Sequence, residues 1–277
     1  MIDLHTHTRE SDGTLTPQEL VSAAAQMELE ALAITDHDTF AGYDQGVACA
    51  RDLGLDLVCG IELSTSFRGR SVHVLGYFLK DGPSEDLRRW LVSLQDSRHQ
   101  RNRRLVDKLR SKGIEITLEE VYQRGSKLPG RPHLAALMIE KGYVTSFRQA
   151  FDEYLGESSV CYTPREDPAF REGVQRIIAG SGLPSLPHPG RISSDRRIIE
   201  EYVDEMRLAG LRGIEAYHSD HSPSDTCFYE SIAQRLRLLV TGGSDFHGAT
   251  KPHVQLGTGI KGALDVPRSV LDDLRRG

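Results

Sequence analysis

Histidine and acidic side chains in this sequence recur at one kind of position, within or directly after short apolar runs that predict β-strands. Imidazole and carboxylate ligands suit Zn²⁺, Mn²⁺ or Fe²⁺, and the absence of thiolates from the set argues against a structural zinc site. The set exceeds the roughly four to six ligands of one ion, but it suffices for two or three ions if Glu62 bridges them. The candidate ligands are His5, His7, Asp12, His37, Glu62, His73, His188, Asp245 and His247.

Each part of this set also has an interpretation without a metal. A His-x-His pair is common by chance, and His73 alone would more often be a core histidine. Asp36 or Asp38 could cap the helix that follows them. The joint pattern favours a metal centre, because so many ligand-type residues at strand ends are not expected by chance.

The elements that must position these side chains alternate between strands and helices at both ends of the chain. Strands are predicted at residues 2–4, 31–35, 57–63, 72–79, 183–186, 213–217 and 238–241. Helices are predicted at residues 16–27, 42–53, 168–179, 195–208 and 223–235. This alternation predicts an α/β fold with a mostly parallel sheet or barrel, in which the carboxyl ends of the strands converge on one face. Because side chains alternate along a strand, His5 and His7 should point the same way and can share one ion, and the same is expected of Asp245 and His247.

The pattern changes near residues 81–83 and returns after residue 166. Between these points, helices are predicted at residues 84–112, 118–123, 132–141 and 147–155. We therefore expect a barrel formed by residues 1–83 and 167–277, with a helical insertion at residues 84–166.

Composition is that of a soluble globular protein: 277 residues, 38% hydrophobic, with a formal net charge of -6. An acidic chain has no global field that attracts phosphate-rich partners, so an anionic substrate would need local positive charge. The four cysteines form no C-x-x-C pair, the N-terminus lacks the pattern of a signal peptide, and no apolar run could span a membrane. We expect a cytoplasmic, reduced protein with no membrane partner.

Taken together, the motifs resemble the polymerase and histidinol phosphatase (PHP) family of metallophosphoesterases. The resemblance rests on D-L-H-T-H-T with Asp12, I-T-D-H-D, G-I-E-L-S, the strand with His73, H-P-G-R and G-S-D-F-H. It covers both α/β stretches and implies a distorted seven-stranded (β/α) barrel with two or three divalent ions at the carboxyl ends of the strands. Manganese is expected, with zinc or iron as alternatives.

The resemblance also divides the candidate ligands among three sites. One ion would be held by His5, His7, Glu62 and Asp245. A second would be held by Glu62, His73 and His188, and a third by Asp12, His37 and His247.

Phosphoester cleavage at neutral pH needs a nucleophile and neutralisation of charge. Metal coordination lowers the pKa of water towards ~7, so we expect a hydroxide that bridges two ions to attack phosphorus in line. The ions and cationic side chains would stabilise the phosphoryl oxygens, and a third ion or a histidine would stabilise the leaving alkoxide. The residues expected to be catalytic are Asp12, Glu62, His188 and His247.

The insertion, with G-R-P-H at residues 130–133, looks like the subgroup of this family that acts on nucleoside 3′,5′-bisphosphates. This implies removal of the 3′-phosphate to give a nucleoside 5′-monophosphate and phosphate. Some members of the subgroup also trim short RNA from the 5′ end, so 5′–3′ exoribonuclease activity is one alternative and histidinol phosphatase activity is another. The intact ligand set argues against a non-catalytic regulatory module, and 6% aromatic residues with a negative charge argue against long duplex nucleic acid as a partner.

Two insertion residues are expected to bind substrate. Arg131 lies at the predicted start of a helix, where anions are favoured, and His133 lies close by. We hypothesise that the insertion is a lid that supplies a second phosphate site. The basic run at residues 98–104 could line the same cleft or form a solvated helix face.

Two barrel residues are also expected to bind substrate. Arg191 follows the loop of His188, and His218 follows a predicted strand, so both should reach the face of the metal ligands. A surface salt bridge is an equal alternative for Arg131 and for Arg191. A hydrogen bond within its loop is an equal alternative for His218.

Overall fold

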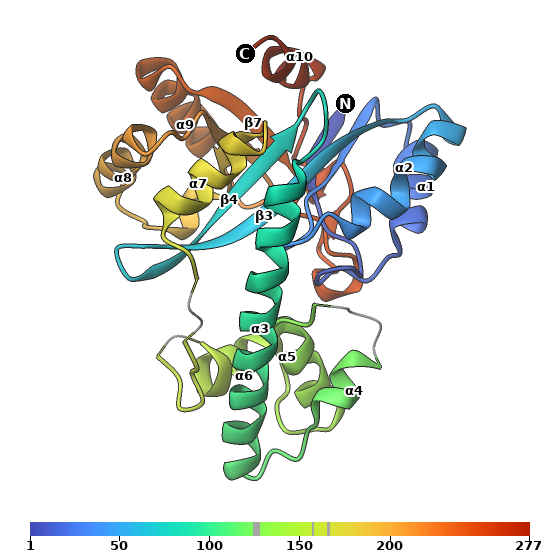
Figure 1. The fold of residues 1–277 in the computed structure, drawn as a ribbon, viewed down its shortest axis with the longest axis vertical. Coiled ribbons are helices and arrows are strands. Elements are labelled where there is room, and N and C mark those ends of the chain that lie inside the picture. Colours follow the sequence, from blue (N-terminus) through green and yellow to red (C-terminus); the bar gives the residue numbers. More distant parts are fainter. Residues whose placement is uncertain (124–127, 157, 165–166) are drawn as a thin grey trace.

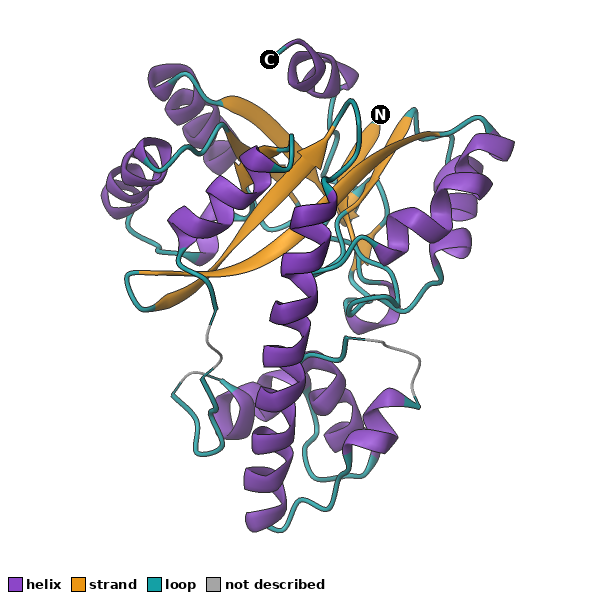
Figure 2. Ribbon diagram, viewed as in Figure 1, coloured by secondary structure: helices purple, strands orange, loops and turns teal. Residues whose placement is uncertain are grey.

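The computed structural model describes residues 1–123, 128–156, 158–164 and 167–277. Seven strands form one sheet in sequence order, surrounded by helices on its outer face (Figure 2). The strands are β1 (Ile2–Thr6), β2 (Ala31–Ile34), β3 (Asp56–Phe67), β4 (Arg70–Phe78), β5 (Leu183–Leu186), β6 (Gly213–His218) and β7 (Leu239–Gly243). The helices around them are α1 (Pro17–Gln26), α2 (Ala41–Leu53), α7 (Phe170–Ala179), α8 (Arg196–Leu208), α9 (Pro223–Leu236) and α10 (Arg268–Arg276).

Main-chain contacts between the first strand and the segment after the last one nearly close the sheet into a barrel. His7 N donates to Phe246 O at 2.9 Å, and Asp245 N donates to His5 O at 2.8 Å. A Cβ atom on Gly243 would lie 2.3 Å from His5 N, so only glycine allows β7 to approach β1 this closely. The α/β barrel that the sequence predicted is therefore confirmed.

Strand β4 departs from the expected parallel arrangement, because it runs antiparallel to both β3 and β5. The turn that joins β3 to β4 contains only Arg68 and Gly69, both with positive φ, and such a short turn leads to an antiparallel partner. The start of β4, and not its end, therefore lies beside the carboxyl ends of the parallel strands. His73 still reaches the expected face, because it lies near the start of β4 and opposite Ser64.

The middle of the chain forms a group of helices below the barrel in Figure 1. They are α3 (Glu85–Ser111), α4 (Leu118–Tyr122), α5 (Arg131–Glu140), α6 (Phe147–Ala150) and the π-helical turn η1 (Phe151–Leu155). Buried residues from Leu105 onwards form a separate apolar core in this group. The first turns of α3 pack against the barrel core through Leu87, Leu91 and Leu94, so this long helix is shared between the two cores. Residue 166, the expected end of the insertion, lies outside the described residues.

Local signals in the sequence explain where several helices begin. Thr16 and Glu19 form a capping box at the start of α1, with Pro17 at its first position, as predicted. Ser84 caps α3 through a hydrogen bond from Leu87 N. Among the described helices, none combines the length and the apolar character needed to cross a membrane.

Candidate metal centre

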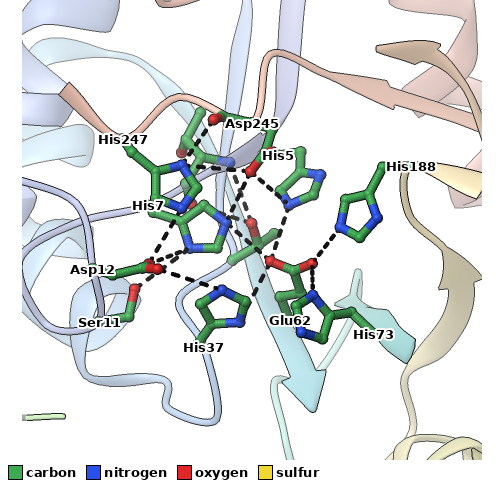
Figure 3. A network of polar contacts seen from close by, with 12 residues as sticks. His5, His7, Ser11, Asp12, His37, Glu62, His73, His188, Asp245 and His247 are labelled. Carbon is green, nitrogen blue, oxygen red and sulfur yellow. Dashed lines mark hydrogen bonds and ion pairs between the residues drawn. The ribbon is translucent and has the colours of Figure 1, made fainter. Parts of the chain in front are cut away.

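All nine predicted ligands converge at one end of the barrel (Figure 3). They arrive there from different elements: His5 lies on β1, Glu62 on β3 and His73 on β4, while the others lie in segments that follow a strand. Ile34 pairs with Cys59 at the end of β2. The same register continues beyond β2, so that His37 lies beside Glu62. The strand-end rule used on the sequence therefore brings together side chains that are far apart in the chain.

Glu62 is the centre of this arrangement, and its two carboxylate oxygens face different sets of imidazoles. Oε1 lies 2.8 Å from His73 Nδ1 and 2.9 Å from His188 Nε2. Oε2 lies 3.2 Å from His5 Nε2 and 3.1 Å from His7 Nε2. A carboxylate in this position can serve two ions at once.

The first group of ligand atoms is the expected one: His5, His7, Glu62 and Asp245 place one atom each within 4.8 Å of one another. Asp245 Oδ1 lies 3.6 Å from His5 Nε2 and 3.5 Å from His7 Nε2. Asp245 has a positive φ of 57°, so the segment after β7 is not extended. Asp245 and His247 therefore belong to different groups of ligand atoms, and the expectation that they point the same way and share one ion is wrong.

The second geometric group contains the three residues expected for the third ion, with His7 in addition. Asp12 Oδ1 lies 3.3 Å from His247 Nε2, and Asp12 Oδ2 lies 3.7 Å from His37 Nε2. His7 faces both groups, because its Nε2 points to Glu62 and its Nδ1 lies 3.6 Å from Asp12.

The remaining group differs in one member from the expected set. Geometry places His37, Glu62 and His73 together, whereas the resemblance implied Glu62, His73 and His188. His188 contacts the same oxygen of Glu62 as His73 does, so both sets share a pair of residues.

Three ligand atoms of this cluster are buried without a hydrogen-bond partner in the part of the chain that the structure describes: His7 Nε2, Asp12 Oδ1 and His37 Nδ1. Leaving such an atom unsatisfied costs roughly 1–3 kcal/mol. The atoms converge with other nitrogen and oxygen donors, without sulfur, and this donor set fits divalent metal ions. The cluster is therefore a metal-binding one.

Burial and close neighbours give four of the ligands the protonation states that metal binding needs, whereas His5 differs: although burial opposes it, Glu215, Glu62 and Asp245 raise the pKa of His5, so an ion must displace its proton. Burial lowers the pKa of His7 and that of His188 to about 3, so both imidazoles are neutral at pH 7. Although burial favours the protonated acid, the surrounding histidines hold the pKa of Glu62 and that of Asp12 well below their usual range. Lone pairs are thus available on both kinds of ligand.

Sequence reasoning missed two charged residues that contact the ligands. Glu215, on β6, lies 2.9 Å from His5 Nδ1 and is fully buried. Lys251 Nζ lies 2.7 Å from Asp245 Oδ2, the oxygen that does not face His5 and His7. An acidic residue inside the apolar run G-I-E-A-Y was a signal for the first, whereas nothing in the sequence around Lys251 marks it.

The two aspartates beside His37 do not cap a helix, since the residue before α2 makes no side-chain capping bond. Asp36 accepts hydrogen bonds from the main chain and the hydroxyl of Thr8. Asp38 accepts hydrogen bonds from the main chain and the hydroxyl of Ser64. Both carboxylates therefore fix the loop that carries His37.

A cleft of about 740 Å³ opens onto the metal cluster. Side chains from both parts of the molecule line it, with Arg131, Phe147 and Phe151 from the insertion and Lys251 from the barrel. A smaller cavity of about 180 Å³ continues between α3 and the barrel, beside Arg98 and Arg131. The insertion thus forms one wall of the space in front of the ligands.

The predicted substrate residues of the insertion differ in what they contact. Arg131, the first residue of α5, lines both cavities and donates to Leu155 O at 3.3 Å. His133 is buried, and its Nδ1 accepts a hydrogen bond from Gly130 N at 3.0 Å, which caps α5. Substrate binding by either residue stays a prediction.

The predicted substrate residues of the barrel both lie beside Asp245 Oδ2. Arg191 Nη2 donates to it at 2.9 Å and to Asp220 Oδ2 at 2.7 Å, so this arginine lines the cleft and forms salt bridges at the same time. His218 Nδ1 accepts a hydrogen bond from Asp220 N at 3.0 Å, which is the loop hydrogen bond that the sequence analysis gave as an alternative to substrate binding. His218 Nε2 lines the cleft at 3.5 Å from Asp245.

Some residues of the basic run at residues 98–104 line a cavity and others form a solvated helix face, so both predicted environments occur. Arg98 and Arg101 are buried and line the smaller cavity, whereas Arg103 and Arg104 are exposed. Arg98 forms an ion pair with Asp38.

Three known proteins that align with most of this chain have names of enzymes that cleave phosphate esters. A family model described as the PHP domain matches residues 3–167. The chain is 32% identical over 248 residues to the 3′,5′-nucleoside bisphosphate phosphatase of Chromobacterium violaceum, covering 89% of this chain and 87% of that protein. It is 33% identical over 259 residues to the phosphoribosyl 1,2-cyclic phosphate 1,2-diphosphodiesterase of Eggerthella lenta, covering 91% of this chain and 97% of that protein. It is 30% identical over 249 residues to the 5′-3′ exoribonuclease of Haemophilus influenzae, covering 88% of this chain and 89% of that protein.

Solved structures share the whole architecture. A predicted metal-dependent phosphoesterase from Bifidobacterium adolescentis superimposes with a TM-score of 0.86 at 32% identity, covering 99% of this chain and 94% of that one. An amidohydrolase from Chromobacterium violaceum, with bound sulfate and no metal, superimposes with a TM-score of 0.88 at 30% identity, covering 99% of this chain and 96% of that one. The insertion is thus part of a fold that these relatives share.

Proposed function

Because the chain belongs to the PHP domain family of phosphoesterases, we propose that it removes the 3′-phosphate of nucleoside 3′,5′-bisphosphates, giving a nucleoside 5′-monophosphate and phosphate. One observation carries the proposal. The ligand cluster, the guanidinium of Arg131 and the aromatic rings of Phe147 and Phe151 line one cleft. Such a cleft offers separate surroundings for a reacting phosphate, a second phosphate and a nucleobase.

We assign three ion positions to the cluster, with manganese as the expected metal and zinc or iron as alternatives. Divalent ions bound there would acidify a water molecule and neutralise charge on the phosphoryl oxygens. Glu62 would connect the positions, since its two oxygens face different histidines. His188 contacts Glu62 Oε1, and Asp12 lies between His37 and His247, so all four proposed catalytic residues touch at least one ion position.

Hydrolysis forms a bond from the oxygen of water to phosphorus and breaks the bond from phosphorus to the 3′-oxygen, which then takes up a proton. His247 would help to hold the ion that stabilises charge on this leaving oxygen. Its Nδ1 donates to Asp245 O at 2.8 Å, so Nε2 is left to face the cleft beside Asp12. Arg191 and Lys251 line the cleft next to Asp245 and would stabilise charge that develops on the phosphoryl oxygens.

The second phosphate would lie against the insertion. Arg131 stands at the start of α5, where the main-chain N–H groups of the helix also favour an anion. The smaller cavity next to it is lined by Arg98 as well, and Ser64 and Ser71 add hydroxyl groups. We therefore give the two parts of the chain different roles. The barrel carries the ions, and the insertion at residues 84–166 acts as a lid that sets specificity.

A screen for release of inorganic phosphate tests this function. The purified protein, loaded with Mn²⁺, would be given nucleoside 3′,5′-bisphosphates, nucleoside 3′- and 5′-monophosphates, histidinol phosphate and a phosphoribosyl cyclic phosphate. We expect the bisphosphates to give the highest kcat/KM, with a 5′-monophosphate as the product. Faster turnover of histidinol phosphate or of the cyclic phosphate would refute the proposal.

A second candidate is 5′–3′ exoribonuclease activity on short RNA, as named for the Haemophilus influenzae relative. Arg191 favours it, because this residue also lines two further cavities, one of about 340 Å³ beside Arg196 and one of about 390 Å³ beside Arg70. Additional backbone phosphates of a short strand could follow this path, whereas long duplex nucleic acid remains disfavoured by the net charge of -6. Release of nucleotides from 5′-labelled RNA of two to five residues, measured beside the bisphosphate, would separate the two candidates.

A further inference from the structure

Glu215 is a fully buried carboxylate inside the barrel, and both of its oxygens are bonded to predicted metal ligands. Oε1 accepts a hydrogen bond from His5 Nδ1 at 2.9 Å. Oε2 accepts a hydrogen bond from the main-chain N–H of His188 at 2.7 Å. The side chain of Glu215, on β6, thus connects β1 with the segment that follows β5.

The first contact decides which nitrogen of His5 faces the metal cluster. Nδ1 and Nε2 of His5 each face a carboxylate, Glu215 and Glu62, and a carboxylate can only accept; once an ion occupies Nε2, Glu215 therefore keeps the remaining imidazole proton on Nδ1. Nε2 is the atom found 3.2 Å from Glu62 and 3.6 Å from Asp245. Outer carboxylates that bond in this way orient a histidine ligand and increase its basicity.

The second contact holds a strained piece of main chain. His188 has φ 32° and ψ 57°, in the left-handed region that a residue with a Cβ rarely adopts. It also precedes Pro189, and a following proline restricts the preceding residue further. Strain of this kind persists only where surrounding contacts enforce it. The hydrogen bond from His188 N to Glu215 is such a contact, and the ring of His188 then meets Glu62 Oε1 at 2.9 Å.

We propose that Glu215 is a positioning residue that prepares His5 and His188 together, so that its loss weakens two ion positions at once. The inference rests on the ion positions proposed above, and it is independent of which phosphoester is the substrate. His5 serves the position shared with His7 and Asp245, whereas His188 serves the position shared with His73.

Glu215→Gln is the variant that tests this coupling. The amide has one acceptor and one donor end, so it can accept from either His5 or His188 N, while its NH₂ group opposes the other donor. Mn²⁺ binding to the metal-free variant, followed by calorimetry and by metal analysis after desalting, should give affinities 10- to 100-fold weaker at two positions. His73→Ala, which removes a ligand from one position only, should weaken one.

Thr241→Val is the matched control, because Thr241 is buried, lies opposite Glu215 in the β6–β7 pairing and bonds Ser185 Oγ at 2.9 Å. We expect this control to lower the melting temperature of the metal-free protein and to leave the number and affinity of bound ions unchanged. Histidine ¹H–¹⁵N correlation spectra of the Zn²⁺-loaded proteins give a second readout, because an ion on Nε2 leaves His5 a single proton. His5 should be the Nδ1–H tautomer in the wild type and in Thr241→Val, and a mixture of tautomers in Glu215→Gln.

Wild-type affinities at every position in Glu215→Gln would overturn the proposal, as would weakening at one position only. If this variant does not fold, Glu215→Asp replaces it, because the shorter carboxylate keeps the buried charge but cannot reach both donors. Failure of the phosphate-release screen would leave these binding results untouched, so the two proposals fail separately.

Discussion

The guanidinium of Arg98, on the helix that links barrel and insertion, forms a buried ion pair with the carboxylate of Asp38, the residue after His37. The same guanidinium lies 3.3 Å from Ser64 Oγ, and Gln95 Nε2 donates to Asp38 O at 3.0 Å. These contacts hold α3 against the loop that carries His37, one of the proposed metal ligands. The position of the insertion and the position of His37 are linked through these contacts.

Replacing Arg98 by methionine should lower the free energy of unfolding by about 3 kcal/mol or more, because the buried charge of Asp38 loses its ion pair with the guanidinium. Urea unfolding of the metal-free protein measures this change. The double variant Arg98→Met with Asp38→Asn should recover part of the loss, since the buried negative charge is removed together with the positive one.

Arg88 provides the comparison for this prediction. It lies on α3, as Arg98 does, but its ion pair with Asp44 is at the surface of the protein. Arg88→Met should cost no more than about 1 kcal/mol. Equal losses for the two arginines would mean that the burial of the Arg98 pair has no energetic consequence.

Metal removal should destabilise the fold. Ions that bind only the folded chain add roughly 2.7 kcal/mol when their free concentration is 100 times the dissociation constant. We therefore expect EDTA to lower the melting temperature and Mn²⁺ to restore it, as followed by circular dichroism. Glu62→Ala should abolish most of this response because Glu62 contacts every ligand group but one, whereas Asp52→Ala, at an exposed carboxylate, should keep it in full.

Turnover gives an independent test of the ligand assignment. In Mn²⁺-saturated protein, Glu62→Ala and His188→Ala should each lower kcat on the best substrate by on the order of 100-fold. Initial rates at saturating substrate measure this. An unchanged kcat in either variant would contradict the assigned roles.

Much of the site was predictable, because the rule that places it is simple. Ligand-type residues at the ends of the parallel strands or directly after them meet at one end of a barrel, and His5, His37 and Asp245 obey this rule. The direction of β4 was not predicted. Hydrophobic patterns predict that a strand exists, but they do not encode which way it runs, and the two-residue turn at Arg68 and Gly69 was the only signal.

Two features of the site that the sequence did not determine are charged groups buried by contacts from other elements: the environment of Arg98 and Arg101, and the presence of Glu215. Arg98 and Arg101 continue the apolar stripe of α3, on the side of Leu94 and Leu105, and helical spacing alone cannot tell a buried arginine from a gap in the stripe. Glu215 lies within an apolar strand, where a charge needs a buried partner. Its partner His5 is 210 residues away, and only the closed barrel brings the two together.

The C-terminal helix should show an acid-dependent attachment to the barrel. Asp56 at the start of β3 accepts hydrogen bonds from Arg275 at 2.7 and 2.8 Å and from Arg268 at 2.9 Å. Although burial opposes it, these arginines lower the pKa of Asp56. The stabilisation is therefore fully present above the unfolded pKa of about 3.9 and is lost as pH falls through the lower folded value.

Asp56→Asn should accordingly lower the free energy of unfolding by about 1 kcal/mol at pH 7. The difference from the wild type should disappear in strong acid, below the folded pKa. Urea unfolding curves between pH 7 and pH 2 measure it, with Asp52→Asn as the exposed control. A difference that persisted unchanged into acid would show that the carboxylate charge is not its source.

Substrate choice should depend on Arg131 more than on any exposed cation of the insertion. If its guanidinium binds the second phosphate, Arg131→Ala should lower kcat/KM for a nucleoside 3′,5′-bisphosphate by ~10- to 100-fold, the equivalent of a charge-assisted contact of roughly 1.5–3 kcal/mol. The rate on a nucleoside 3′-monophosphate, which lacks that phosphate, should change little. Arg148, also in the insertion but 91% exposed, is the matched control, and Arg148→Ala should leave both substrates unaffected. Equal losses on the two substrates in Arg131→Ala would mean that this residue acts on the reacting phosphate or on the fold, and the lid would then have no part in recognising a bisphosphate.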